Sequence, residues 1–431
     1  MFLTIDRRTA GLSLVAITTA HLLGYLPQAD AWAGSWAATS TSFDYAFLVS
    51  LPVSTAAAAY AAGTLRNDVV TALILTSPRG AATPRLRHLL EFTAVQSLAM
   101  LLAALPAAVI TCRSASYGHV ALQNATSVVA LGMLAGAMGQ CMTRLLRPAI
   151  AAPVAAVLVY GVIGGLLFRG STTLSLLTPV DLQWEVFVRP APWIPLVQGT
   201  FLALAAISIT LSLARARRTA VWTASLAASF TAAALLYVGS STVSIDEAAT
   251  ALVCSRSENG TTICLPRAKS YMAEDAAEEV ERLAAVVPGT LDGVTLVDDE
   301  ARGLDPLVDT ELEAYASDGD VLFFSEFSDT SARTVLDADA FQLGLVRELF
   351  GPFNEGPAST SGVQEATDND VVGWYVTSAT GLAGKLPHVL GAPALGPENL
   401  EYTQEAAELE RWLLHAGDDD RSAYLSRFAE E

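Results

Sequence analysis

The sequence has little lysine, histidine and cysteine and lacks several motifs of well-known enzyme chemistry. Of its 431 residues only two are lysine, five are histidine and four are cysteine. The P-loop pattern Gly-x-x-x-x-Gly-Lys-Ser/Thr does not occur, so the chain cannot bind and hydrolyse ATP in the P-loop manner. The patterns His-Glu-x-x-His and Gly-x-Ser-x-Gly do not occur either. We therefore expect that the chain is not an enzyme by itself and binds no metal or cofactor of its own.

Charge is also scarce, and it is unevenly distributed. Only 16% of the residues are charged and the mean hydropathy is +0.41, yet the net charge is −19. Residues 1–245 hold 7 acidic and 14 basic side chains, a net charge of +7, whereas residues 246–431 hold 37 acidic and 11 basic side chains, a net charge of −26. This contrast predicts a membrane domain over 1–245 and an acidic soluble domain over 246–431. It argues against a nucleic-acid-binding protein, because the soluble part has no basic surface, and against a disordered chain.

Long apolar runs are confined to the first domain. A helix needs about 20 apolar residues to cross a hydrocarbon core of roughly 30 Å. Seven stretches qualify, at 10–27, 43–63, 90–111, 120–143, 149–168, 194–213 and 220–243. The first stretch follows Arg7 and Arg8, as the apolar run of a secretory signal would. Its polar His21 and the lack of a small-x-small cleavage site favour a retained helix.

The arginines near the ends of these stretches predict the orientation of the chain. Cytoplasmic loops of membrane proteins carry an excess of Lys and Arg. If the seven stretches alternate, one side receives Arg7, Arg8, Arg66, Arg79, Arg85, Arg87, Arg144, Arg147, Arg215, Arg217 and Arg218, and the other only Arg113, Arg169 and Arg189. We therefore expect a multi-pass protein of the cytoplasmic membrane with a cytoplasmic N-terminus and an extracellular acidic domain. Without the seventh span, the acidic domain would be cytoplasmic instead.

The cysteines give a second indication of where the acidic domain lies. Cys254 and Cys264 flank a short polar, turn-like segment just after the seventh stretch. Two cysteines that close such a loop in an exported domain most simply form a disulfide. The alternative is a metal site, which we disfavour because no further Cys or His lies nearby. Cys112 and Cys141 lie at the ends of apolar stretches, where free thiols behave as small apolar residues.

Polar side chains inside the apolar stretches are the candidates for a functional site. His21, Gln96, Gln123 and Asn124 either form hydrogen bonds between helices or line a translocation path. The first interpretation is the more common one for such residues, and both stay open at this point. Glu91 opens the third stretch beside basic residues, which predicts a surface ion pair.

The acidic domain is long enough for one hydrophobic core and has a mixed α and β pattern in which helices dominate. Helices are expected at 269–287, 338–350, 398–415 and 421–428, and short strands at 294–297 and 321–324. Periodicity places Ala273, Ala277, Val280 and Ala284 on the buried side of the first helix, and Phe341, Leu345, Val346 and Leu349 on that of the second.

The layout of the whole chain resembles that of type-2 ATP-binding-cassette permeases. The resemblance rests on a short N-terminus, six helices, a polar loop after the second span and a hydrophobic loop at 169–193 before the sixth. In the polar loop, Leu73-Ile74-Leu75-Thr76-Ser77-Pro78-Arg79 is similar to the leucine-x-x-threonine-proline-arginine coupling segment, with Ser77 inserted before Pro78. The seventh helix and the following domain, with Cys254 and Cys264-Leu265-Pro266, resemble a variant of actinobacterial permease-like proteins.

This resemblance implies a fold, a set of partners and a function. The implied fold is a polytopic α-helical membrane protein of about seven transmembrane helices, six in the type-2 arrangement, plus a C-terminal α+β extracellular domain. The implied function is that of a permease subunit, and more specifically an exporter. It would pair with a second copy or a paralogous permease in the lipid bilayer, and a separate cytoplasmic ATPase would carry ATP and Mg. The residues expected to contact this ATPase are Leu65, Arg66, Asp68, Leu75, Pro78 and Arg79.

Two other functions are compatible with the sequence. In one, the spans anchor an extracellular sensor or interaction domain and transport nothing. In the other, the extracellular domain is an enzyme of a type that shows none of the motifs sought above. A copurifying ATPase with a P-loop is expected only of a permease, so affinity purification separates these hypotheses.

Overall fold

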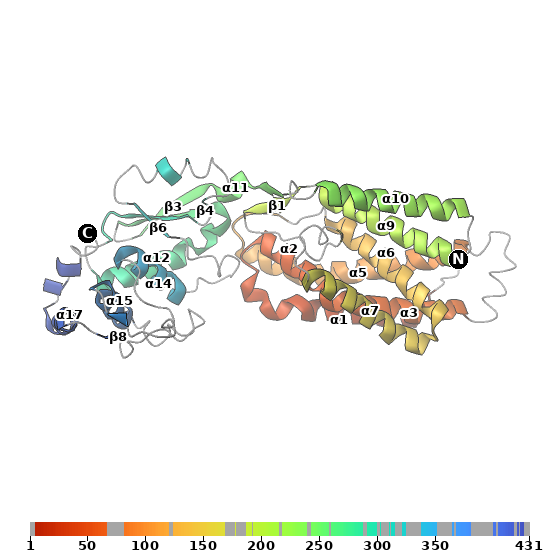
Figure 1. Cartoon of the computed structure of the whole chain (residues 1–431), viewed down its shortest axis with the longest axis horizontal. Coiled ribbons are helices and arrows are strands. Elements are labelled where there is room, and N and C mark those ends of the chain that lie inside the picture. The colour runs from red at the N-terminus through yellow and green to blue at the C-terminus, as the bar shows by residue number, and fades with distance from the viewer. Residues whose placement is uncertain are drawn as a thin grey trace. The chain divides into compact units, whose positions relative to one another are not determined.

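The computed structural model of the chain forms two compact units, which are described separately here. The first is Met1–Asp246 and the second is Glu247–Glu431 (Figure 1). The sequence analysis placed the domain boundary after residue 245. The structure describes residues 5–66, 82–119, 124–168, 177, 187–191, 193–214, 218–238, 243–257, 260–287, 291–299, 302, 310, 312–314, 321–324, 338–350, 364–365, 368–380, 400–401, 404–417, 420–421 and 423–425.

The first unit is a bundle of long helices (Figure 1). Its helices are α1 (Arg7–Tyr25), α2 (Trp36–Tyr45), α3 (Phe47–Ala62), α5 (Ala82–Ser114), α6 (Asn124–Leu145), α7 (Pro148–Phe168), α9 (Trp193–Leu213) and α10 (Arg218–Val238), with 3-10 turns η1 (Leu26–Ala31) and η2 (Gly63–Arg66). Among the described residues, six helices are long and apolar enough to cross a membrane, and α2 with α3 would make a seventh span bent by 43°. Large apolar side chains such as Val157 and Phe230 point outward. The unit therefore has the build of a polytopic helical membrane protein.

The helices differ from the predicted spans mainly at their ends. The second span is two helices, because the chain bends at Ala46 between α2 and α3. The third span is longer at both ends, as α5. The seventh was predicted to run to residue 243, but α10 ends at Val238 and Val243–Ile245 form strand β2. The β-branched residues of this segment favour a strand, and they find a partner strand near α9.

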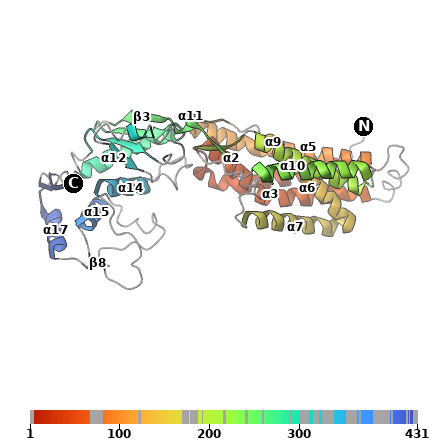
Figure 2. The ribbon, with the colours of Figure 1, turned by 45° about the horizontal axis from the view of Figure 1, so that its top comes forward.

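Glycines of α6 let neighbouring helices approach closely. A Cβ on Gly139 would lie 2.6 Å from the Cβ of Ala58 on α3, and one on Gly132 would lie 2.9 Å from the Cδ of Gln96 on α5. Accordingly, α6 is the most buried of the long helices and α10 the least. The glycines of α7 differ, because a Cβ on Gly161 or Gly165 would meet nothing within 4 Å. Figure 2 shows α7 at one edge of the bundle.

The end of the first unit is fastened to the bundle at several points. Strand β1 (Val188–Pro190) pairs with β2 in an antiparallel ladder. Next to it, the backbone N–H of Asp246 donates to the carbonyl oxygen of Phe187 at 2.9 Å. The hydroxyl of Tyr117, after α5, lies 3.0 Å from both carboxylate oxygens of Asp246. The last residue of the unit is thus held through its backbone and its side chain.

The second unit contains a small sheet with helices packed against it (Figure 1). Its elements are α11 (Glu247–Thr250), β3 (Leu252–Arg256), β4 (Thr262–Pro266), η4 (Arg267–Met272), α12 (Ala273–Val286), β5 (Thr295–Asp298), β6 (Val321–Phe324), α14 (Ala338–Phe350), β7 (Gln364–Glu365), α15 (Asp368–Ala379), β8 (Leu400–Glu401) and α17 (Gln404–His415). The sheet order is β3-β4-β5-β6, with β3 antiparallel to β4 and the other pairs parallel. Strands β7 and β8 form a separate parallel pair.

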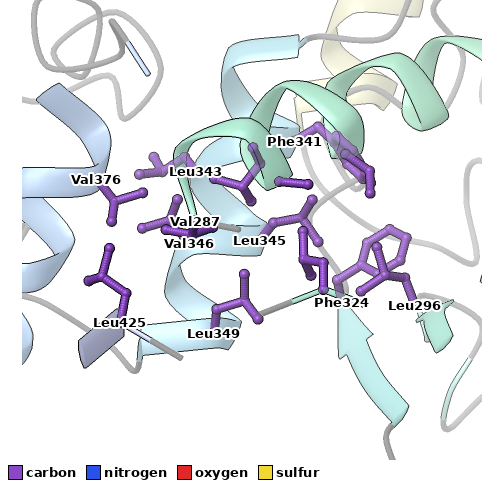
Figure 3. Close-up of a cluster of buried hydrophobic side chains, with 14 of the residues drawn as sticks. Val287, Leu296, Phe324, Phe341, Leu343, Leu345, Val346, Leu349, Val376 and Leu425 are labelled. Atoms are coloured by element: carbon purple, nitrogen blue, oxygen red, sulfur yellow. The ribbon is translucent and has the colours of Figure 1, made fainter. Parts of the chain in front are cut away.

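The core of the second unit lies between this sheet and helices α12, α14 and α15. Figure 3 shows Phe324 of β6 and Leu296 of β5 beside the side chains of α14. The residues predicted on the buried side of α14, namely Phe341, Leu345, Val346 and Leu349, are all buried. Burial of aliphatic and aromatic side chains contributes about 1.5–3 kcal/mol each relative to exposure, which makes this cluster the main stabilising element of the unit.

Helix α12 begins later than predicted, and the face that it buries is rotated from the predicted one. It begins at Ala273 instead of residue 269, because residues 267–272 form the 3-10 turn η4. Val280 and Ala284 are buried as predicted, and Ala276 and Leu283 also lie in the core, whereas Ala273 and Ala277 are only partly buried. The larger side chain of Leu283 gains more from burial than an alanine does, which accounts for the rotation. Similarly, α17 begins at Gln404, six residues later than predicted, after the short strand β8.

The disulfide predicted between Cys254 and Cys264 is present. These residues stand directly opposite each other on the antiparallel strands β3 and β4. The disulfide therefore fastens the edge strand β3 to the rest of the sheet. Cys112 and Cys141 are free.

Candidate functional site

Two serines on one face of α3 join two of the predicted site residues. Ser50 and Ser54 are four residues apart, so they lie on the same side of the helix, one turn from each other. The Nδ1 atom of His21 on α1 lies 2.9 Å from the hydroxyl oxygen of Ser50. The hydroxyl of Ser54 donates to the Oε1 atom of Gln96 on α5. All four side chains are buried. We call His21, Ser50, Ser54 and Gln96 the polar seam.

The seam is enclosed by apolar and aromatic groups. The ring of His21 contacts the rings of Phe43 and Phe47, at centroid distances of 4.2 and 5.0 Å. On the other side, Gly132 of α6 leaves the space that the amide of Gln96 occupies. Among the described residues, neither the Nε2 atom of His21 nor the Nε2 atom of Gln96 has a hydrogen-bond partner. Buried polar atoms of this kind ordinarily pair with protein or water, so the seam can accept further hydrogen-bonding groups.

A second polar contact joins α5 and α6 nearer to the ends that face η2. The amide nitrogen of Gln140 donates to the backbone oxygen of Arg85 at 3.2 Å and lies 3.4 Å from the Nδ1 atom of His88. Gln140 and His88 are both buried. This contact lies about two helical turns along α5 from Gln96, since each turn contains 3.6 residues.

A third polar contact lies at the opposite end of α6 and contains the predicted site residue Asn124. Its amide nitrogen is 3.5 Å from a carboxylate oxygen of Asp44, which is only 3% exposed. The sequence analysis did not single out Asp44. Its position could have identified it, because it is a carboxylate inside the predicted span 43–63. Ser50 and Ser54 were missed for a different reason, because serines are common in transmembrane helices and only their spacing of four marks one face.

The predicted ATPase-contact residues are described only at the start of their segment. Leu65 is buried in the 3-10 turn η2, which ends at Arg66. A Cβ on Gly63 at the start of this turn would lie 2.9 Å from the ring of Pro148, so η2 begins against the start of α7. Asp68, Leu75, Pro78 and Arg79 lie outside the described residues, as does the predicted path residue Gln123.

Glu91 forms the ion pair that its position suggested. Its Oε1 atom lies 2.9 Å from the Nε atom of Arg87, one turn earlier on α5. Its Oε2 atom accepts the backbone N–H of Ile5 at 3.2 Å, which ties the start of the described chain to α5. A partly exposed pair with this spacing contributes on the order of 0.5 kcal/mol, so its role is local positioning.

The second unit contains an ion pair that the sequence analysis did not predict. The Nζ atom of Lys269, on η4, lies 3.5 Å from the Oδ2 atom of Asp298 at the end of β5, and both side chains are fully buried. Burial lowers the pKa of Lys269 to about 8 and raises the pKa of Asp298 to about 6, and each shift is reduced by the opposite charge of the partner. Asp299 follows on the same strand end and pairs with Arg302 at 3.8 Å.

The side chains at these sites can form hydrogen bonds and ion pairs. Among the described residues, no group of three His, Cys, Asp or Glu side chains is placed to hold a metal ion. The chain matches no family model, no curated protein and no solved structure. The geometry of the chain itself therefore carries the functional interpretation. The polar seam is its most developed feature, because three helices contribute to it and it lies in the centre of an apolar bundle.

Proposed function

We propose that the chain is the membrane-spanning permease subunit of a bacterial ATP-binding-cassette transporter that works as an exporter. A separate cytoplasmic ATPase subunit would bind ATP and Mg and supply the energy. The N-terminus and segment 67–81 would be cytoplasmic, and the second unit extracellular. In support, the bundle has the number of long apolar helices that this arrangement needs, and its arginines follow the cytoplasmic bias of short loops.

The observation that carries the proposal is that segment 67–81 connects, along the sequence, the two helices that share a hydrogen bond of the polar seam. This segment joins η2, which follows α3, to the start of α5. Helices α3 and α5 are the two that share the Ser54–Gln96 hydrogen bond. A force applied to the segment therefore acts directly on the two helices that hold the seam closed. A two-state rearrangement of these packed helices is the ordinary way in which a distant binding event opens a closed site.

The polar groups of the seam then have a role in transport. When α3 and α5 separate, Ser54 and Gln96 lose their mutual hydrogen bond, and these two side chains, with His21 and Ser50 beside them, can bind a polar part of a substrate. Desolvated polar groups inside a membrane protein are costly unless paired, so the closed state and the substrate-bound state are both favoured over an empty open state. A second copy of the chain, or a paralogous permease, would complete the path.

The test uses a charge reversal in the cytoplasmic segment. Replacing Arg79 with Glu should reduce copurification of a P-loop ATPase with the full chain and abolish ATP-dependent export. The control is Arg147→Glu, which reverses an exposed arginine on the same predicted side, just before α7, and should leave both unchanged. Full copurification and full export in the Arg79 variant would refute the role assigned to segment 67–81.

The second candidate is a membrane-anchored sensor or interaction protein that does not transport. It is favoured by one observation, namely that the second unit has its own core and its own disulfide. Under this alternative no ATPase copurifies with the wild-type chain. The same purification therefore distinguishes the two functions before any variant is made.

A further inference from the structure

Asp44 is a buried carboxylate to which the described residues offer no basic partner. It lies in the last turn of α2 and is only 3% exposed. Each of the ion pairs among the described residues involves other residues, and the one described side chain within hydrogen-bonding distance of its carboxylate is the neutral amide of Asn124. An ionised carboxylate is very costly to bury in such a place unless a positive charge accompanies it.

The contact with Asn124 also indicates that a positively charged group belongs beside Asp44. Asn124 is 8% exposed, and among the described residues its Oδ1 atom has no hydrogen-bond donor. Its amide nitrogen faces Asp44 at 3.5 Å, a long distance for a hydrogen bond to a charged acceptor, which is typically 2.7–2.9 Å. This contact is therefore weak, and a neutral amide supplies no charge that would offset an ionised carboxylate.

The backbone around Asp44 also favours a bound cation. Asp44 lies next to the 43° bend between α2 and α3, and its own carbonyl oxygen accepts the N–H of Ala46 in the last turn. The C-terminal end of a helix carries a partial negative charge, which disfavours an ionised carboxylate and favours a cation. Interrupted transmembrane helices supply cation sites in this way in membrane transporters.

In the part of the chain that the structure describes, no basic side chain forms an ion pair with Asp44. The titratable residues of the neighbouring helices at this end of the bundle are His21 and Tyr25 of α1, which contact Phe43, and Cys112 and Arg113 of α5, which are exposed. Helix α2 itself adds the exposed Tyr45, α3 adds only Tyr60 near its far end, and α6 adds Cys141 and Arg144 at its far end. The ring of His21 is already bonded to Ser50.

We propose that Asp44 is a proton-binding site, whose carboxyl group holds a proton while this end of the bundle is closed. The reaction is the association of a proton from water with the carboxylate to give a neutral carboxylic acid, with no other bond made or broken. Loss of the proton leaves an unpaired buried charge, and hydration of that charge requires α2 and α3 to separate at their bend. Proton occupancy thus controls opening at Asp44, independently of any action of an ATPase on segment 67–81.

Infrared difference spectroscopy of the full chain tests the protonation state directly. The spectrum of the wild type minus that of Asp44→Asn at neutral pH and without sodium should contain the carbonyl stretch of a protonated carboxylic acid. The matched control, Glu91→Gln, removes the ion-paired carboxylate of α5 and should give carboxylate bands in its own difference spectrum. Carboxylate bands for Asp44 would overturn the proposal, and bands that depend on added sodium would assign the site to a metal cation instead.

A chemical label provides a second measurement that needs no variant to fold. Dicyclohexylcarbodiimide is an apolar reagent that modifies protonated carboxyl groups in apolar surroundings. The wild-type chain should gain one adduct on the peptide that contains Asp44 and none at Glu91. Labelling that increases as the pH falls supports an exchangeable proton. Labelling at Glu91 with none at Asp44 would refute the proposal.

Discussion

Replacing Lys269 with Met removes one half of an ion pair that has no contact with solvent. Its Nζ atom and the Oδ2 atom of Asp298 are 3.5 Å apart, and both side chains are fully buried. Removing one partner of a buried pair leaves the other charge uncompensated, which costs about 3–5 kcal/mol. For a unit of this size each kcal/mol shifts the unfolding midpoint by roughly 2–4 °C, so the midpoint should fall by roughly 6–20 °C.

The neutral pair made by combining Lys269→Met with Asp298→Asn should behave differently. It removes both charges and keeps the hydrogen-bonding capacity of the side chain at 298. Burial raises the pKa of Asp298 from 3.8 to about 6, and one pKa unit corresponds to 1.36 kcal/mol, so keeping this group ionised costs on the order of 3 kcal/mol. The double variant is therefore expected to be at least as stable as the wild type at neutral pH.

The pH dependence follows from the direction of both pKa shifts. The folded state binds more protons than the unfolded state at Asp298 between about pH 4 and 6, so this group lowers stability as the pH rises through that range. At Lys269, whose pKa falls from 10.5 to about 8, the unfolded state binds more protons between about pH 8 and 10.5, so stability rises again there. The advantage of the double variant should be greatest between pH 6 and 8 and smaller at pH 5 and pH 9.5.

Hydrogen exchange measured by mass spectrometry on the full chain provides the assay. Peptides from β4 and β5 report the opening of the second unit separately from the helical bundle, which a single melting curve cannot do. The single variants should exchange faster than the wild type, and the double variant should not. A double variant as labile as the single ones, or a difference that does not change with pH, would refute the electrostatic reasoning.

Two further substitutions test packing and cross-linking. Gly139→Ala should destabilise the helical bundle by about 1–3 kcal/mol, because the new Cβ would lie 2.6 Å from the Cβ of Ala58. The control is Gly161→Ala, whose new Cβ would meet nothing within 4 Å and should not destabilise the bundle. Thermal unfolding in detergent compares the two variants, and equal midpoints would contradict the close approach of α3 and α6. Replacing Cys254 and Cys264 with Ala should destabilise the second unit by about 2–3 kcal/mol, because the unfolded chain is no longer closed into a short loop and gains conformational entropy. Denaturant unfolding of the oxidised chain is the comparison, and an unchanged midpoint would count against it.

Much of the first unit could be predicted from the sequence because a membrane imposes a simple rule. A span needs about 20 apolar residues, and those runs are visible without knowledge of the partner helices. The bend at Ala46 was not predicted, because the predicted span 43–63 begins only three residues before it, and the one interruption of the apolar run there, Asp44, does not by itself distinguish a bend from a helix end. Strand β2 was missed because Val243 to Ile245 are equally compatible with the end of an apolar helix, and only pairing with β1 decides between them.

The candidate site was predictable in its polar residues but not in their pairing. His21 and Gln96 stand out as polar groups inside apolar stretches, yet their partners Ser50 and Ser54 are ordinary residues for such a helix. The same holds in the second unit, where Lys269 was predicted as the start of a helix. Its buried ion pair with Asp298 depends on the parallel pairing of β4 with β5 and on the turn η4, which carries Lys269 past the end of β4. Contacts of this kind depend on tertiary structure, which local pattern does not encode.

The fastening of Asp246 has a mechanical consequence. A pull on the second unit reaches the bundle through this residue, which is bonded to Phe187 through its backbone and to Tyr117 through its carboxylate. The β1–β2 ladder and the loop after α5 therefore share the load before α10 bears it. Because α10 is the least buried of the long helices, it would otherwise be the one most easily drawn out of the bundle. The contacts of Asp246 therefore protect α10 from force, so that a pull on the second unit by a large partner would not displace this helix from the bundle.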